Sequence, residues 1–180
     1  MSKISPTPST AKLIISVCRA HFAVVLLLAA QILLYYSWQL ITPQAVLSRW
    51  VATSAFFAAV ISIWYLAHHT THQATIKKLV LALVTSDIAL ASYSVYTQRG
   101  MAARAVALYA LPIIVAGILA SRSALLATAA LCVAAYTTTT LSYFVINFNE
   151  GLKIELYGEV GFYSALFFVI AWLLWIMRTK

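Results

Sequence analysis

The chain has 180 residues, of which 63% are hydrophobic and only 9% are charged, and its formal net charge is +8. A soluble domain has roughly 45–50% apolar and about 25% charged residues, so this composition excludes an ordinary water-soluble globular domain. We therefore expect a membrane protein. Topology and attraction to anionic lipid explain its basic excess without a nucleic-acid partner.

The first eleven residues are polar, include Pro6 and Pro8, and are expected to form a disordered cytoplasmic leader. Residues 12–180 are apolar runs joined by short connections, which predicts a single integral-membrane helical domain. A cleaved signal peptide is the alternative at the start, since Lys3, Lys12 and Arg19 resemble its charged segment. The apolar run that follows is longer than the roughly 7–15 residues of such a signal, so we expect an anchor.

Six apolar runs predict an all-α, polytopic transmembrane helix bundle with six spans. About 20 apolar residues cross a bilayer as a helix, and a helix satisfies its own backbone hydrogen bonds in lipid. The expected spans cover residues 21–41, 50–67, 79–97, 102–120, 124–146 and 160–177. The fourth is short and contains Pro112. A five-span alternative without it would place the termini on opposite sides of the membrane.

The second and third runs are joined by a histidine-rich stretch, "HHTTHQ", which includes His68, His69 and His72. His68 and His72 would share a helix face, as metal ligands can. No carboxylate or paired cysteine completes a ligand shell in that loop. We therefore expect a solvated loop that titrates near neutral pH, with no metal and no other cofactor.

The third run contains Asp87, the first acidic residue of the chain. It lies eight residues after Leu79, about 12 Å along a helix, so we expect it near mid-membrane and facing the bundle interior. An ionised carboxylate there costs at least about 2.5–3.5 kcal/mol. Hydroxyls are the candidate partners: Tyr109, Ser92 and the Thr137–Thr140 group. A structural hydrogen bond, a role in signal transmission and a proton or ion path all remain open.

The fourth and fifth runs supply the other members of a candidate intramembrane polar site. Pro112 is expected to kink the fourth span and free a backbone carbonyl, as an architectural feature or as a hinge. Thr137 and Thr138 belong to a threonine run that either packs against neighbouring helices or lines the interior beside Asp87. The candidate signalling site is therefore Asp87, Tyr109, Pro112, Thr137 and Thr138. Two cysteines, Cys18 and Cys132, are interpreted as apolar fillers.

Lysine and arginine placement predicts the orientation. With six spans, eight of the twelve Lys and Arg residues lie on the side that holds both termini. Both termini are therefore expected to be cytoplasmic, in a bacterial inner membrane. Glu150, Glu155 and Glu159 then lie in the largest outer loop. The sequence has no G-x-S-x-G, Walker A or Gly-rich nucleotide motif, so we expect no catalytic site.

The stretch "SDIALASYSVYTQRG…ALYALPIIVAGILASRSALLATAALCVAAY" resembles the six-span N-terminal sensor domain of bacterial histidine kinases of the pilus-regulating type. The matching residues are Asp87, Gly100, Tyr109, Leu111, Pro112, Ile113, Ser121 and Arg122. The outer loop departs from the family: "TQRGMAAR" stands where paired glycines and Ser-Pro are usual. No kinase domain is expected within the three residues after Met177. The resemblance implies a membrane sensing module of a two-component system, as a cut fragment or a stand-alone relative.

We therefore expect a non-catalytic sensor that detects a membrane-embedded or lipid-soluble cue and transmits it through helix repacking. Its expected partners are membrane lipids and either a second copy, joined through the last span, or another membrane protein. One alternative is a small transporter or channel that uses Asp87 to couple protons or a solute. Another is a structural subunit of a larger membrane complex.

Overall fold

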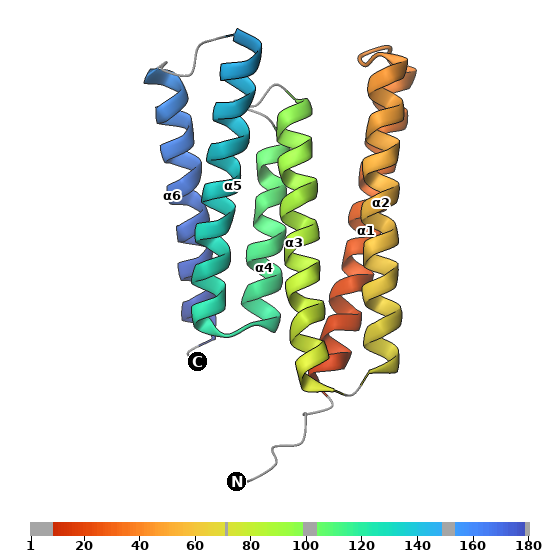
Figure 1. The fold of residues 1–180 in the computed structure, drawn as a ribbon, viewed down its shortest axis with the longest axis vertical. Coiled ribbons are helices and arrows are strands. Elements are labelled where there is room, and N and C mark those ends of the chain that lie inside the picture. Colours follow the sequence, from red (N-terminus) through yellow and green to blue (C-terminus); the bar gives the residue numbers. More distant parts are fainter. Residues whose placement is uncertain (1–8, 71, 99–103, 149–153, 179–180) are drawn as a thin grey trace. The chain divides into compact units, whose positions relative to one another are not determined.

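The computed structural model describes residues 9–70, 72–98, 104–148 and 154–178, and every regular element in these ranges is a helix (Figure 1). The elements are α1 (Ser9–Ser37), α2 (Pro43–His69), α3 (Gln73–Thr97), the 3₁₀ helix η1 (Arg104–Tyr109), α4 (Ala110–Leu119), α5 (Arg122–Phe148) and α6 (Ile154–Met177). Five of them are long and apolar enough to cross a membrane, and Arg104–Leu119 forms a shorter apolar helix. The predicted all-α transmembrane bundle is thus confirmed.

The chain divides into two compact units, and the boundary falls within α3, between Leu83 and Val84. The first unit contains α1, α2 and the beginning of α3. The second contains the rest of α3 together with η1, α4, α5 and α6. The candidate site residues named above all belong to the second unit.

Within the first unit, α1 and α2 lie side by side (Figure 1). Gln39, two residues beyond the end of α1, has a positive φ of 54°, and the amide of Leu40 donates to the carbonyl of Tyr35 at 2.9 Å. This bond spares a carbonyl that the helix end would otherwise leave unpaired. Thr42 then caps α2, its hydroxyl accepting from the amide of Ala45, and Pro43 follows at the start of α2, where no amide is needed. The hairpin is therefore fixed by its own turn residues.

α1 begins at Ser9, well before the expected start of the first span at residue 21. The hydropathy boundary was set by Lys12 and Arg19, whose charges shorten the apolar run. A helix needs no such run, because long basic side chains on its end can reach the membrane surface while the backbone stays helical. Of the expected leader, residues 1–8 lie outside the described part.

The fourth span is a composite of two helix types. Six residues of 3₁₀ helix rise about 2.0 Å each and ten residues of α-helix rise about 1.5 Å each, so η1 and α4 together extend about 27 Å. That length nearly matches the roughly 30 Å hydrocarbon core. The change of helix type falls between Tyr109 and Ala110, so Pro112 lies in the first turn of α4, where a missing amide is tolerated.

α6 begins at Ile154, six residues before the expected start of the last span at residue 160. Glu155 and Glu159 therefore belong to its first turns, not to an outer loop, while Glu150 lies outside the described residues. Acidic side chains suit this position, because the N-terminal end of a helix carries partial positive charge. A prediction from hydropathy places the end of a span at a charged residue, although the helix continues past that residue.

The core of the second unit is closely packed where α4 meets α6. A Cβ atom added at Gly117 would lie 2.8 Å from Cδ1 and 3.3 Å from Cβ of Leu174. Close approach of backbones over small residues is how helices associate in lipid. A Cβ atom added at Gly158 or Gly161 of α6 would meet no atom within 4 Å. Of these three glycines, Gly117 is therefore the one at which a close helix contact requires glycine.

Candidate functional site

Asp87 is buried in α3, with 1% of its surface exposed. It lies ten residues before the end of α3 at Thr97, about 15 Å along the helix axis. Its carboxyl group interacts electrostatically with the thiol of Cys132 on α5. The acid therefore lies inside the protein, facing another helix of the second unit.

Tyr109 is the central residue of this interior. It is completely buried, and its hydroxyl oxygen lies 2.8 Å from the hydroxyl oxygen of Ser92 on α3. The same hydroxyl also interacts with Thr139 on α5. A buried tyrosine needs such a partner, because a hydroxyl left unbonded in an apolar medium costs about 1–3 kcal/mol. Tyr109 thereby links two long helices through one polar atom.

The backbone of Tyr109 is engaged as well. The thiol of Cys132 lies 3.8 Å from the Tyr109 carbonyl oxygen and donates a weak hydrogen bond to it. That carbonyl belongs to the last residue of η1, where the change to α-helical geometry begins. Cys132 was interpreted from the sequence as a filler. Its role emerges only from the position of η1, which no local pattern indicates.

The ring of Tyr109 belongs to an aromatic cluster that extends to α6. Its centroid lies 5.5 Å from that of Phe167 and 5.9 Å from that of Tyr136. Tyr136 in turn lies 5.6 Å from Tyr163 and 6.0 Å from Phe167, in edge-to-face arrangements. Such pairs contribute roughly 0.5–1.5 kcal/mol beyond the area they bury. We call Tyr109, Tyr136, Tyr163 and Phe167 the aromatic cluster.

The hydroxyls of Tyr136 and Thr140 differ from that of Tyr109 in their hydrogen bonding. They are neighbours one helical turn apart on α5, and both are buried. Neither forms a well-aligned hydrogen bond with another described residue.

The remaining sequence candidates occupy different places. Pro112 is buried in the first turn of α4. Thr137 is half-buried and Thr138 is exposed, whereas Thr140 is completely buried. The buried face of α5 follows the four-residue repeat through Cys132, Tyr136 and Thr140. Thr138 lies two residues from Tyr136, about 200° around the helix, and so faces away from the aromatic cluster.

His68 and His69 are the last two residues of α2 and do not lie in the expected loop, and both rings contact aromatic residues of the same helix. The rings of His68 and Trp64 lie 4.8 Å apart, and those of His69 and Tyr65 lie 4.5 Å apart. Among the described residues, no three His, Cys, Asp or Glu side chains gather as a metal site would require.

Long apolar helices and a polar interior centred on buried Tyr109 define a class: a polytopic α-helical membrane protein. The comparison with protein families then assigns the chain more closely, because the model of the PilS-like transmembrane domain matches residues 9–178. The chain belongs to this family, as its resemblance to a six-span sensor domain predicted. No curated protein and no solved structure matches it. The family supports a membrane sensor-type module, and the matched domain is not itself catalytic.

Proposed function

We propose that the chain detects a membrane-embedded or lipid-soluble cue and transmits it by repacking its helices, as part of two-component signalling. The observation that carries this proposal is the position of Tyr109. Its hydroxyl bonds to Ser92 of α3, its carbonyl accepts from Cys132 of α5, and its ring contacts Phe167 of α6. One buried residue thus connects three long helices.

The transmission step follows from these contacts. A cue that displaces α3 relative to η1 strains or breaks the Ser92–Tyr109 hydrogen bond. The Tyr109 ring then moves against Phe167, which is 2% exposed and has little free space around it. Packed interiors respond to such shifts by changing to a second arrangement. α6 would therefore reorient as a unit.

The far end of α6 is also attached to its neighbours. The guanidinium of Arg178 donates to the carbonyl of Ala120 at the end of α4. The guanidinium of Arg122, at the start of α5, lies 5.9 Å from the centroid of the Trp175 ring. A change in α4 or α5 is therefore communicated to the middle of α6 and to its C-terminal end, where a sensor would pass its signal on.

The proposal includes a homodimer formed through α6 in a bacterial inner membrane, with both termini cytoplasmic. Large apolar side chains recur on the exposed surface of α6 at alternating four- and three-residue spacing: Phe162, Leu166, Val169, Leu173 and Ile176. This is the spacing at which two helices pair along a common seam. The excess of Lys and Arg on the side of the termini supports the orientation.

Fluorine NMR of 5-fluorotryptophan-labelled protein tests the transmission step. The Tyr109→Phe variant keeps the ring and loses the bond to Ser92, so we expect the Trp175 resonance on α6 to shift. Tyr36→Phe, an exposed position on α1, is the matched control and should leave that resonance in place. Coincident Trp175 resonances in the parent and in Tyr109→Phe would contradict the transmission through Tyr109.

Disulfide crosslinking of single cysteines along α6 tests the homodimer. Crosslinking in native membranes should be strongest at Phe162, Val169 and Leu173 and absent at the buried positions Phe167 and Ala171. The parent protein, whose Cys18 and Cys132 are both buried, gives the background. Uniform crosslinking at exposed and buried positions would count against a specific seam.

A further inference from the structure

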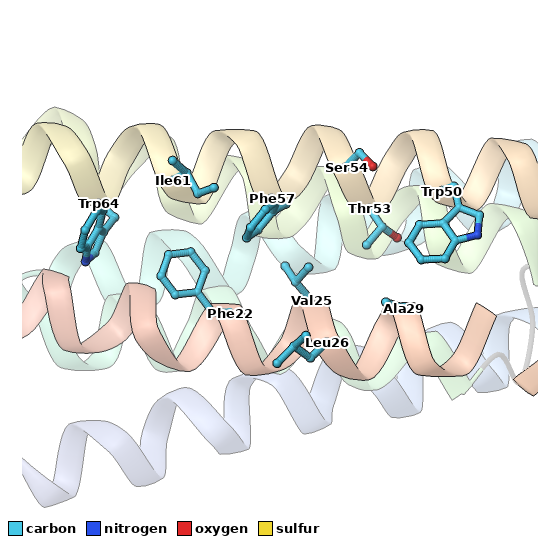
Figure 2. Close-up of a pocket in the computed structure, with 10 residues that line it drawn as sticks. All are labelled: Phe22, Val25, Leu26, Ala29, Trp50, Thr53, Ser54, Phe57, Ile61 and Trp64. Atoms are coloured by element: carbon cyan, nitrogen blue, oxygen red, sulfur yellow. The ribbon is translucent and has the colours of Figure 1, made fainter. Parts of the chain in front are cut away.

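A groove of about 620 Å³ runs between α1 and α2 on the first unit (Figure 2). Val25 and Thr53 are buried and form its floor, whereas Leu26, Phe57 and Ile61 are exposed and form its rim. The other lining residues are Phe22, Ala29, Trp50, Ser54 and Trp64. The groove is therefore almost entirely apolar.

The dimensions of the groove indicate what can occupy it. Trp50 and Trp64 lie at its two ends (Figure 2) and are fourteen residues apart on α2, about 21 Å along the helix axis. A narrow apolar groove of this length fits one extended hydrocarbon chain.

Polar groups are concentrated at the Trp64 end. The indole N–H of Trp64 is buried and has no hydrogen-bond acceptor among the described residues. The imidazole of His68 lies 4.8 Å from the Trp64 ring. On α1, exposed Arg19 precedes Phe22 by three residues and so lies on the same helix face, and the Phe22 ring is 6.4 Å from that of Trp64.

The opposite end of the groove also carries a cation, which an aromatic ring engages. The arginine there, Arg49, has its guanidinium 5.9 Å from the centroid of the Tyr35 ring, in a cation–π contact. At the Trp64 end, by contrast, Lys77 and Lys78 follow in the first turns of α3 and are both exposed. Positive charge near a membrane surface attracts anionic lipid by about 1 kcal/mol per Lys or Arg. The Trp64 end is therefore the end that suits an anionic headgroup.

We propose that this groove binds one acyl chain of an anionic phospholipid, with the headgroup at the Trp64 end. Arg19 and His68 hold the phosphate. The chain runs over Val25 and Thr53 toward Trp50. This site is independent of the signalling role proposed above.

Quenching of single-tryptophan variants by brominated lipid tests this site. Nanodiscs of phosphatidylcholine would carry an equal mole fraction of either brominated phosphatidylglycerol or brominated phosphatidylcholine. Trp64 should be quenched about twofold more strongly, or better, by the anionic lipid. Trp172 is the matched reporter, because it also lies five residues before the end of its helix and is exposed on α6. It should be quenched equally by both lipids.

Two substitutions at exposed positions complete the test. Arg19→Gln and His68→Gln together should abolish the preference at Trp64 and leave Trp172 unchanged. Native mass spectrometry of the chain with all its tryptophans provides an independent readout, in which a retained phosphatidylglycerol should be lost from the double variant. Equal quenching of Trp64 by both lipids, or a preference and a retained lipid that survive both substitutions, would show ordinary boundary lipid only and overturn the proposal.

Discussion

The α1–α2 pair and the helices of the second unit associate by different means. In the pair, contacts between Phe22 and Phe57 are aromatic, and Nδ1 of buried His21 lies 2.8 Å from the carbonyl of Val17 in its own helix. In the second unit, polar groups bond from one element to another, as between Ser92 and Tyr109. In lipid, apolar side chains gain no hydrophobic free energy by moving from the acyl chains to another helix. Directional bonds and close packing therefore fix the second unit, whereas the pair keeps an open groove.

The largest expected effect is at the centre of the aromatic cluster. Phe167→Ala removes a buried ring that contacts Tyr109 and Tyr136. It should lower the free energy of unfolding by about 3 kcal/mol, the lower end of the range for soluble cores, because lipid replaces water in the reference state. SDS-induced unfolding measures this. Phe168→Ala, on the same helix, 44% exposed and outside the proposed dimer seam, should change it by less than about 0.5 kcal/mol. Equal losses would remove the distinction between core and lipid-facing side chains of α6.

The next largest loss of stability is expected for Gly117→Ala. The added methyl group would meet Leu174 at distances that require α4 or Leu174 to shift, and overpacking of this kind costs about 1–3 kcal/mol. Gly161→Ala in α6 meets open space and should stabilise the helix by up to about 1 kcal/mol through propensity. Thermal unfolding in detergent should therefore shift in opposite directions for the two variants. A shared direction would mean that α4 and α6 are not in close contact at Gly117.

A smaller difference should separate the two buried tyrosines. Tyr109→Phe removes a paired hydroxyl and leaves Ser92 without it, so we expect a loss of about 0.5–1.5 kcal/mol. Tyr136→Phe removes a hydroxyl without a well-aligned hydrogen bond, and should be neutral or stabilising. The comparison uses the same substitution at two neighbouring rings. If Tyr136→Phe proved the more destabilising, the Tyr136 hydroxyl would be a bonded group and the contrast between the two tyrosines would fail.

The smallest expected effect is in the α1–α2 groove. Leu26 is 71% exposed at the groove rim, and lipid can take the place of its side chain. Leu26→Ala should therefore change the SDS-unfolding free energy by less than about 0.5 kcal/mol. Val60→Ala, fully buried on α2, is the control and should cost more. A large loss at Leu26 would indicate that the groove is part of a packed interface.

Hydropathy was sufficient to predict the membrane-spanning helices, because length and apolar composition are properties of each segment alone. It could not predict where helices start, since Arg19 and Glu155 end an apolar run without ending a helix. It also could not predict that the fourth span would gain length from a 3₁₀ segment. Helix type at Arg104–Tyr109 depends on neighbours that the local sequence does not reveal.

The candidate site was only partly predictable, for a related reason. Asp87 and Tyr109 stand out because polar groups are costly in lipid. Phe167 and Tyr136 do not stand out, since aromatic residues occur throughout the chain and only the fold brings these two together. The threonine run left open a packing surface or an interior lining, and in the structure Thr140 is buried whereas Thr138 is exposed. Two residues along a helix are enough to turn a side chain to the opposite face.

The two helix types in the fourth span have a mechanical consequence. A 3₁₀ helix advances about 2.0 Å per residue with 3.0 residues per turn, and an α-helix advances about 1.5 Å with 3.6. If Arg104–Tyr109 converted to the α form, the segment would shorten by about 3 Å and unwind by about 120°. Its backbone would exchange one set of internal hydrogen bonds for another. Such a conversion would both translate and rotate the helix segment that carries Tyr109.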